Sequence, residues 1–212
     1  IQVVYYFFSY FKIAKEKKIN FVVPTGNFGD IYAGYVAKKM GLPINKLIIA
    51  TNNNDILKRV FNTGIYKPLK VKHTISPSMD IQVASNFERL LFYAVGQDDQ
   101  KVSLLMNHLS KKGFFILDQS TIQDIKKDFE AVKINDEATQ LIIKNINDEF
   151  NFIIDPHTAT GFGAAKKIKG LKNIVVLGTA HPFKFSDTVK KAIGKNLEAP
   201  SHLNMDVDKK EK

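Results

Sequence analysis

A short apolar run, a glycine-rich turn and the start of a helix follow one another near the beginning of the chain, and this combination restricts the fold more than any other stretch. Residues 21 to 24 are apolar and include the β-branched Val22 and Val23, which is typical of a buried strand, and residues 25 to 29 form the turn. From residue 30 the composition is helical up to a stop signal at Gly41. A second apolar run at 46 to 50 predicts the next strand, and together these elements predict a βαβ unit with a parallel sheet.

The glycine-rich turn also predicts an anion site. The free backbone N–H groups of the turn and of the first helical turn converge, and the helix dipole adds partial positive charge, so that a phosphate group is favoured there. Gly26 and Gly29 allow the backbone to approach a ligand closely. The alternative is an ordinary strand-to-helix turn with Asp30 as its N-cap residue, because short turns of this kind are common. The residues of the turn leave both interpretations open.

The net charge of +10 would suit a nucleic-acid-binding protein, but the distribution of the charge does not. Arg59 and Arg89 are the only arginines, the lysines are spread over the whole length, and no segment alternates basic with aromatic residues. The apolar stretches are interrupted by charge well before the roughly 20 residues that a membrane-spanning helix needs. We therefore expect neither nucleic acid nor a membrane as a partner.

Cysteine and histidine usage narrows the chemistry further. The chain has no cysteine, which excludes disulfides, thiolate metal sites and thiol catalysis and is compatible with a reducing compartment. Its five histidines occur singly, without the spacing of a metal-binding motif, so that we expect no metal site. His157 and His181 follow predicted strands, and each could serve a site or be a structural residue that forms hydrogen bonds beside a proline.

Periodicity and stop signals predict further elements along the chain. Residues 3 to 11 are too uniformly apolar for an exposed helix and lead into a lysine-rich segment at 15–18, which predicts a buried helix with a solvated C-terminal end. Helical spacing with mixed charge predicts a helical excursion at the surface, at about 118–150, rather than more sheet. After residue 200 the chain is polar and charged, which predicts a loose tail over 201–212. The other predicted helices are 55–61, 81–93 and 100–112, and the other predicted strands are 114–117, 152–155 and 173–178.

Polar side chains follow two of the predicted strands, at the edge where parallel sheets present ligand contacts. Thr179 comes directly after the strand at 173–178. The asparagines at 52 to 54 follow the strand at 46–50. They could hold a ligand, although asparagine after a strand is also ordinary turn and N-cap chemistry.

A second candidate anion site lies on the predicted helix at 81–93. Asn86 and Arg89 are three residues apart and share one face of that helix. The planar donor fork of Arg89 could hold an anion, or it could contact Ser85 or Glu88 within the helix. The residues themselves do not decide between these two roles.

Four sequence blocks taken together resemble threonine synthase, a family of fold-type II enzymes that use pyridoxal 5'-phosphate. They stand in the family's order, with plausible spacing, and the resemblance extends from Ile1 to about Leu197. The blocks are Pro-Thr-Gly-Asn-Phe-Gly-Asp at 24–30, Ser-Pro-Ser-Met-Asp-Ile at 76–81 with 85–89, Asp-Pro-His-Thr-Ala at 155–159, and Thr-Ala-His-Pro at 179–182. The chain looks like the C-terminal portion of the branch with a longer chain, which is shared by fungi and many bacteria.

The resemblance implies an α/β fold of the tryptophan-synthase-β type, a three-layer αβα arrangement around a largely parallel sheet. Residues 1–200 would form the C-terminal part of the catalytic domain. The resemblance also implies a set of site residues. The family's cofactor phosphate would be held by Gly26, Asn27, Phe28, Gly29 and Asp30, the pyridine nitrogen would be contacted by Thr179, and the substrate side would include Ser78, Asn86 and Arg89.

The reaction implied by the resemblance is the conversion of O-phospho-L-homoserine and water to L-threonine and phosphate, a step of threonine biosynthesis. The lysine that binds the cofactor as a Schiff base in this family corresponds to a position upstream of Ile1, and no lysine here lies in a matching motif. We therefore assign no catalytic residue and expect residues 1–212 alone not to turn over substrate. We expect the full-length enzyme to be a cytoplasmic monomer.

Two other functions remain as alternatives. Another fold-type II lyase, such as a threonine dehydratase or a tryptophan-synthase-like enzyme, would share the glycine turn and a hydroxyl at the pyridine nitrogen. The blocks at 76–81 and 155–159 argue against that class. A truncated, non-catalytic phosphate-binding module would keep the turn without the lysine, and the reading frame upstream of Ile1 would distinguish it.

Overall fold

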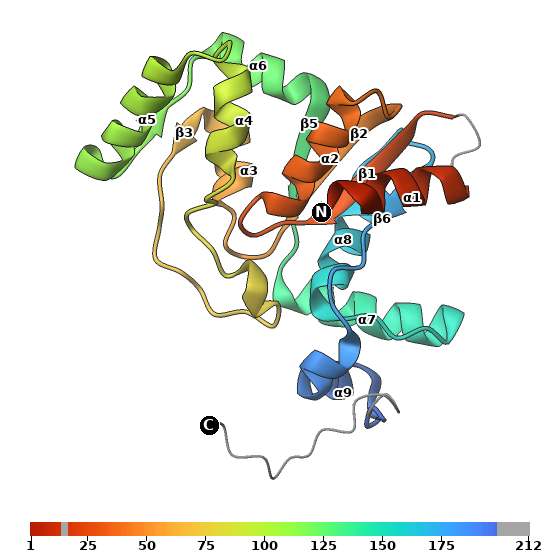
Figure 1. The fold of residues 1–212 in the computed structure, drawn as a ribbon. Helices are drawn as coiled ribbons and strands as arrows, with labels where there is room; N and C mark the ends of the chain where they lie inside the picture. The colour runs from red at the N-terminus through yellow and green to blue at the C-terminus, as the bar shows by residue number, and fades with distance from the viewer. Residues whose placement is uncertain (14–16, 199–212) are drawn as a thin grey trace, which may run out of the picture.

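The chain folds around a four-stranded parallel sheet, which Figure 1 shows at the centre of this computed structural model. The structure describes residues 1–13 and 17–198, so the tail predicted at 201–212 lies outside the described residues. The strand order is β5-β2-β1-β6, and all pairs are parallel. The four strands are β1 (Ile19–Pro24), β2 (Ile44–Thr51), β5 (Phe129–Lys133) and β6 (Ile174–Val176). The predicted βαβ unit is confirmed, with α2 (Gly29–Lys39) as its helix.

Helices cover both faces of the sheet, as parallel sheets require. Alternate residues of each central strand enter opposite cores: Phe21 and Val23 pack on one face, whereas Val22 packs on the other. The first face carries α1 (Val3–Ile13), α2, α3 (Ile56–Thr63) and α6 (Gln119–Asp128), and the second carries α7 (Asp136–Phe150), α8 (Pro156–Lys167) and α9 (Ser186–Ile193). The three-layer α/β fold predicted from the sequence is confirmed.

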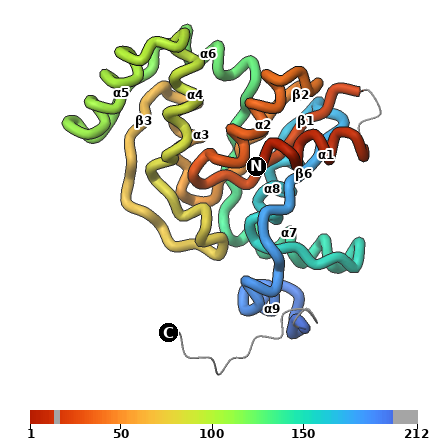
Figure 2. The backbone as a smooth tube through the Cα atoms, viewed as in Figure 1, coloured from red at the N-terminus to blue at the C-terminus, as the bar shows by residue number. Residues whose placement is uncertain are grey.

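A smaller unit lies beside the main sheet, and Figure 2 shows it as the yellow and green segments at one side of the molecule. Its two short strands pair antiparallel and are packed by aromatic stacking. The Tyr66 ring stacks on Phe87 at 5.5 Å and on Phe115 at 4.7 Å between ring centroids. The elements are β3 (Ile65–Tyr66), β4 (Phe115–Ile116), the 3-10 turn η1 (Pro77–Met79), α4 (Phe87–Ala94) and α5 (Asp99–Lys112).

The segment predicted as a helical excursion at about 118–150 is not entirely helical. Helices α6 and α7 flank β5, and β5 pairs with β2 in register from Leu47↔Phe129 to Thr51↔Lys133. The strand has only five residues, of which only Phe129 and Val132, three positions apart, are buried, and it forms the edge of the sheet. Such a short and half-polar strand carries little signal against a mixed-charge helix.

Two other predicted elements differ from the structure. Residues 81–86 are not helical, because the Ala84 N–H donates to the Tyr66 hydroxyl at 2.8 Å and the Asn86 N–H donates to the Asn27 carbonyl at 3.0 Å. These contacts with distant segments replace the helical hydrogen bonds, and α4 begins only at Phe87. Residues 152–155 are extended but pair with no strand of the described chain.

Helix α1 is more exposed than its composition predicts. The ring of Tyr6 is buried against α2, where Gly34 has no room for a Cβ, which would lie 2.5 Å from that ring. The other face is turned to water, with Phe8 and Phe11 exposed to 63% and 76%. The prediction of a buried helix is therefore wrong for the described residues, in which only one layer packs on α1. No helix in the described part of the chain is long and apolar enough to cross a membrane.

Candidate functional site

The glycine turn connects β1 to α2 and leaves the start of that helix open. Phe28 adopts the left-handed conformation, with φ 69° and ψ 5°, and its ring is buried against Phe87 and Phe129. An apolar side chain at this position cannot accept hydrogen bonds from the first helical turn, and no side chain caps α2. The Asn27 side chain accepts one bond, from the Gly29 N–H at 2.9 Å. The partial positive charge of the helix start is therefore not neutralised by a capping carboxylate.

Two segments from the predicted substrate side lie against this turn. A Cβ built on Gly26 would lie 2.9 Å from the carbonyl oxygen of Ser78, so that only glycine lets the η1 segment approach this closely. The Asn27 carbonyl accepts hydrogen bonds from both the backbone N–H of Asn86, at 3.0 Å, and its side-chain Nδ2, at 3.1 Å. Backbone contacts thus join residues that are more than fifty positions apart in sequence.

A cavity of about 190 Å³ lies where the turn, η1 and the segment after β6 meet. The predicted residues that line it are Gly26, Asn27, Asp30, Ser78 and Thr179. Asn27 also lines an adjoining cavity of about 360 Å³, together with the predicted residues Gly29, Asn86 and Arg89. Phe28 lines neither cavity, and it contributes its backbone conformation and core packing. The structure therefore brings the predicted site residues to one continuous region.

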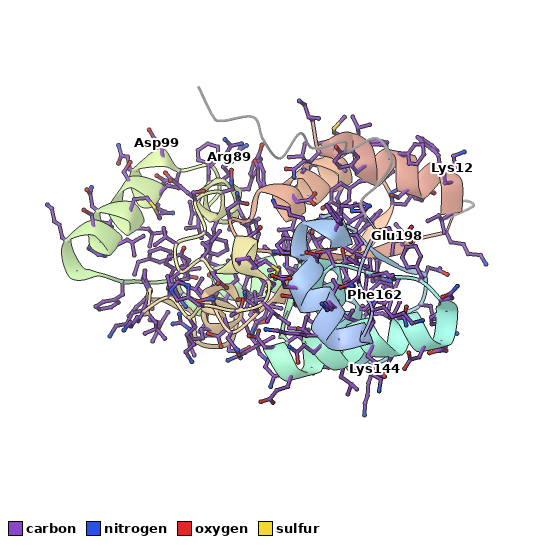
Figure 3. All side chains as sticks on the ribbon, turned by 90° about the horizontal axis from the view of Figure 1, so that it is seen from below. Lys12, Arg89, Asp99, Lys144, Phe162 and Glu198 are labelled. Carbon is purple, nitrogen blue, oxygen red and sulfur yellow. The ribbon has the colours of Figure 1, made fainter. Side chains whose placement is uncertain are left out.

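Arg89 faces the outer part of this region. Its guanidinium lies over the Tyr32 ring, 5.9 Å from the centroid, and it lines both the 360 Å³ cavity and an open one of about 760 Å³. Figure 3 shows Arg89 on the same side of the molecule as Asp99; the two residues lie in the first turns of α4 and α5. No hydrogen bond or ion pair among the described residues occupies this guanidinium, in contrast to Arg59, which binds Asp55 at 3.0 Å. The donors of Arg89 remain available to a ligand.

Asp30 lies in the first turn of α2, but its side chain is held by a neighbour. The buried hydroxyl of Tyr6 donates to the Asp30 carbonyl at 2.8 Å and approaches its Oδ1 at 3.3 Å. Burial raises the pKa of Asp30, and the hydrogen bond from Tyr6 offsets part of this rise. Burial, followed by the charge of Asp30, raises the pKa of Tyr6 well above its ordinary value. Asp30 is thus tied to α1 and does not cap its own helix.

The asparagines at 52 to 54 hold a loop. The Asn52 Nδ2 donates to the Asp80 Oδ1 and to the Thr74 hydroxyl, both at 2.8 Å. The Asn54 Nδ2 donates to the Lys72 carbonyl at 2.8 Å. Both side chains are buried, and their amide donors are used within the protein. This cluster fastens the segment that carries η1 to the end of β2.

The two histidines left open by the sequence have different positions. His157, on α8, lines the 190 Å³ cavity, and both of its ring nitrogens have partners. Nδ1 lies 3.0 Å from the Asp155 Oδ1, and Nε2 accepts the Ser78 N–H at 3.2 Å. His181 caps the short helix η2 (Pro182–Phe185), where its Nδ1 accepts the Phe183 N–H at 3.2 Å.

The comparisons with known proteins point to the threonine synthases. A family model described as "Threonine synthase, C-terminal" matches residues 158–212. The threonine synthase of Saccharomyces cerevisiae is 44% identical over 91% of this chain, and that of Pseudomonas aeruginosa is 41% identical over 95%. The crystal structure of PLP-bound threonine synthase from Brucella melitensis superposes with a TM-score of 0.92, at 47% identity over 95% of this chain. The chain matches the C-terminal portion of the threonine synthases.

The match covers only part of those proteins. The chain spans 42% and 44% of the yeast and Pseudomonas threonine synthases and 44% of the Brucella chain. A serine racemase from Dictyostelium discoideum, with 16% identity and a TM-score of 0.50, and a threonine deaminase from Solanum lycopersicum, with 14% and 0.55, share the fold alone. The similarity to threonine synthases is therefore much greater, in both sequence identity and TM-score, than the similarity to these other enzymes of the same fold.

One cation that lines the cavity, Lys184, is not among the residues predicted from the sequence. Lys184 lines the 190 Å³ cavity together with residues of the glycine turn, and its Nζ lies 5.8 Å from the centroid of the Phe185 ring. Phe185 in turn packs on His157, with 4.6 Å between ring centroids. Lys184 lies five residues after Thr179, and this closeness to the end of a predicted strand was the only sequence signal for a role in the site. Because a 3-10 turn lies between the two residues, the sequence does not show which of the side chains after it line the cavity.

Proposed function

We propose that this chain forms the cofactor-phosphate side of a threonine synthase active site, which converts O-phospho-L-homoserine and water to L-threonine and phosphate with pyridoxal 5'-phosphate. One observation carries the proposal: the uncapped N-terminus of α2 opens into a cavity whose lining includes Thr179 and Ser78. The similarity to threonine synthases at 41% to 44% identity supports the choice of reaction.

The residues at the glycine turn fit a phosphate group. The donors are backbone N–H groups at a helix start, where the dipole favours negative charge and no capping side chain competes. The close packing at Gly26 fixes the turn against η1, so that the donors are held in place before a ligand arrives. Lys184 adds a positive charge to the lining of the cavity. We propose Gly26, Asn27, Phe28, Gly29 and Asp30 as the phosphate-binding segment.

Thr179 is the proposed partner of the pyridine nitrogen. When bound, pyridoxal phosphate withdraws electrons from the substrate and thereby stabilises a carbanion next to the amino group. A hydroxyl partner does not force the ring nitrogen to be protonated, as a carboxylate partner would. This chain therefore favours a milder electron sink, and the positions of protein groups must direct the proton transfers.

Arg89, Asn86 and Ser78 are the proposed residues on the substrate side. The free guanidinium of Arg89 suits the dianionic phosphate ester, which must be held and then released. Asn86 links that helix to the Asn27 carbonyl, so the two proposed phosphate sites are joined by hydrogen bonds of 3.0 Å and 3.1 Å. This coupling would keep the substrate ester at a fixed distance from the cofactor.

Product analysis with the intact protein tests the proposal. Incubation with O-phospho-L-homoserine and pyridoxal 5'-phosphate should release threonine and inorganic phosphate in equal amounts, whereas threonine should not be deaminated. Conversion of threonine to a 2-oxo acid in place of this reaction would favour a dehydratase. Residues 1–212 alone should form no threonine. We further propose that the intact enzyme is a cytoplasmic monomer, which fractionation and light scattering would check.

A further inference from the structure

The starts of α8 and η1 meet at a buried histidine. His157 is 3% exposed and Asp155 is 1% exposed, and both come from the segment that opens α8. His157 Nδ1 lies 3.0 Å from the Asp155 Oδ1, while its Nε2 accepts the backbone N–H of Ser78 at 3.2 Å. The histidine therefore connects the second face of the sheet to the wall of the proposed active site.

These two contacts assign the tautomer of His157. A neutral imidazole has one donor and one acceptor nitrogen, and a backbone N–H can only donate. Nε2 must therefore carry no proton, and the proton on Nδ1 is donated to Asp155. The same carboxylate also accepts the His157 N–H at 2.8 Å and the hydroxyl of Thr158, so that its own position is fixed. Because both ring nitrogens are used, His157 is poorly suited to exchange protons with a ligand.

Ser78 lies between this histidine and the glycine turn. Its N–H points to His157, and its carbonyl oxygen would be 2.9 Å from a Cβ on Gly26. The neighbouring Met79 sulfur is 3.7 Å from the hydroxyl of Thr160, also on α8. Contacts from α8 therefore help to set the location of η1 over the cavity, together with the Asn52 and Asn54 contacts that fasten the same segment to β2. A shift of η1 would move Ser78 relative to a ligand bound at the turn.

We propose that His157, oriented by Asp155, is a positioning residue that sets the place of Ser78 in the substrate site. This inference rests on the proposed function, since it assumes that Ser78 contacts the substrate. It assigns His157 no proton transfer to the substrate. If the proposal is correct, the reaction requires a hydrogen-bond acceptor at the position of Nε2, and it does not require the imidazole to act as an acid or a base.

Nitrogen NMR of the intact, ¹⁵N-labelled protein tests the tautomer directly and needs no change at the site. The His157 signals are assigned by their absence from a His157→Gln sample. At neutral pH, Nδ1 should show a directly bonded proton and Nε2 should not. A proton on Nε2, or a doubly protonated ring, would contradict the proposal whether or not the protein makes threonine.

Kinetics of two variants test the consequence. His157→Phe keeps an aromatic ring against Phe185 but removes the acceptor, and we expect a KM for O-phospho-L-homoserine raised about tenfold, the effect of losing about 1.4 kcal/mol. His157→Gln offers an amide oxygen to the Ser78 N–H and should stay within about threefold of the wild-type KM. A purely structural role would lower kcat through loss of folded protein and leave KM unchanged.

The same two substitutions at His108, a half-buried histidine on α5 remote from the cavity, serve as matched controls and should leave KM unchanged. An unchanged KM in folded His157→Phe, or a glutamine variant no better than the phenylalanine variant, would overturn the proposal. If the wild-type protein does not use O-phospho-L-homoserine, the proposed function fails, and the NMR result still decides the tautomer. If His157→Phe does not fold, the NMR measurement of the His157 tautomer still tests the proposal.

Discussion

The N-termini of α2 and α8 lie at the same cavity, but they differ in whether a carboxylate side chain caps the first turn of the helix. At α8, Asp155 accepts hydrogen bonds from the N–H groups of His157 and Thr158, and Pro156 removes another free donor. At α2, the capping position is held by Phe28, whose ring is in the core, and the first helical turn has no carboxylate cap, only the Asn27 amide oxygen at the Gly29 N–H. Both helices follow chain segments that approach the same edge of the sheet, so the difference comes from residue choice.

This difference separates a structural helix start from a binding one. A carboxylate that belongs to the protein satisfies the donors of α8 permanently, and it also orients His157. The donors of α2 have no such partner and keep their affinity for an external anion. An acidic cap at α2 would compete with phosphate, and the one acidic residue of its first turn, Asp30, is held by Tyr6. Helix α8, which is capped, therefore positions the site, whereas the start of α2 is open to bind an anion.

The largest effect is expected at the turn of the binding helix. Gly26→Ala places a Cβ 2.9 Å from the backbone oxygen of Ser78, which cannot move aside as a flexible side chain would. We expect kcat/KM for O-phospho-L-homoserine to fall about a hundredfold, because misplacement by about 1 Å has that order of effect. Gly178→Ala, whose Cβ would meet its nearest neighbour at 3.8 Å, is the matched control. Equal activity of the two variants would show that the close approach is not required.

Removal of the cap from the structural helix should mainly affect stability. Burial alone would raise the pKa of Asp155, but the hydrogen bonds from His157 and Thr158 outweigh it and lower that pKa. Asp155→Ala should reduce the free energy of unfolding by about 2 to 4 kcal/mol, measured by urea denaturation at neutral pH.

The same carboxylate gives a pH dependence. Because the pKa of Asp155 is lower in the folded state, its contribution is present above the unfolded-state value, about 3.9, and is lost as the pH falls through the folded value. Wild-type protein should therefore lose stability below about pH 4 more steeply than Asp155→Asn. Parallel acid transitions for the two proteins would contradict the assignment.

A smaller effect is expected where α1 supports the binding helix. Tyr6→Phe removes the hydroxyl that donates to the carbonyl and the side chain of Asp30. The free energy of unfolding should fall by about 1 to 2 kcal/mol at neutral pH. Burial raises the pKa of Asp30, and the hydrogen bond from Tyr6 opposes this rise because it stabilises the ionised carboxylate. Since that carboxylate is ionised at neutral pH and partly protonated near pH 4, the variant should lose more stability at neutral pH. An equal loss at both pH values would argue against this contact.

The smallest effect calibrates an ordinary cap far from the cavity. Asn135 caps α7, where its side-chain oxygen accepts the Ala138 N–H at 3.0 Å. Asn135→Ala should lower the free energy of unfolding by about 1 kcal/mol and leave kcat/KM unchanged. A loss of activity in the folded variant would show that helix caps far from the cavity also affect the site, which would contradict the distinction between a structural helix start at α8 and a binding one at α2.

The sequence predicted best the features that depend on local pattern. The strand, turn and helix around Gly26 were found because hydrophobic periodicity and glycine placement are local signals. Thr179 lines the cavity as a residue that follows the predicted strand at 173–178, although β6 (Ile174–Val176) ends three residues before it. Residues 81–86 were predicted wrongly because the Tyr66 hydroxyl and the Asn27 carbonyl, both distant in sequence, replace the helical hydrogen bonds.

The parts of the site that depend on tertiary contacts were not predictable in this way. The link from Asp155 through His157 to Ser78 spans 79 positions between its last two members, and no local pattern reports it. Lys184 reaches the cavity only because η2 turns the chain back toward α8. Strand β5 was missed because an edge strand of five residues has little hydrophobic alternation.

A crystal structure of the intact protein with pyridoxal 5'-phosphate is the most direct test of the central claim, that the uncapped start of α2 is the phosphate site. We expect the phosphate to accept hydrogen bonds of about 2.7 to 3.2 Å from backbone N–H groups of residues 26 to 30, with the Thr179 hydroxyl at the ring nitrogen. A phosphate bound elsewhere, with those N–H groups facing only water, would contradict it.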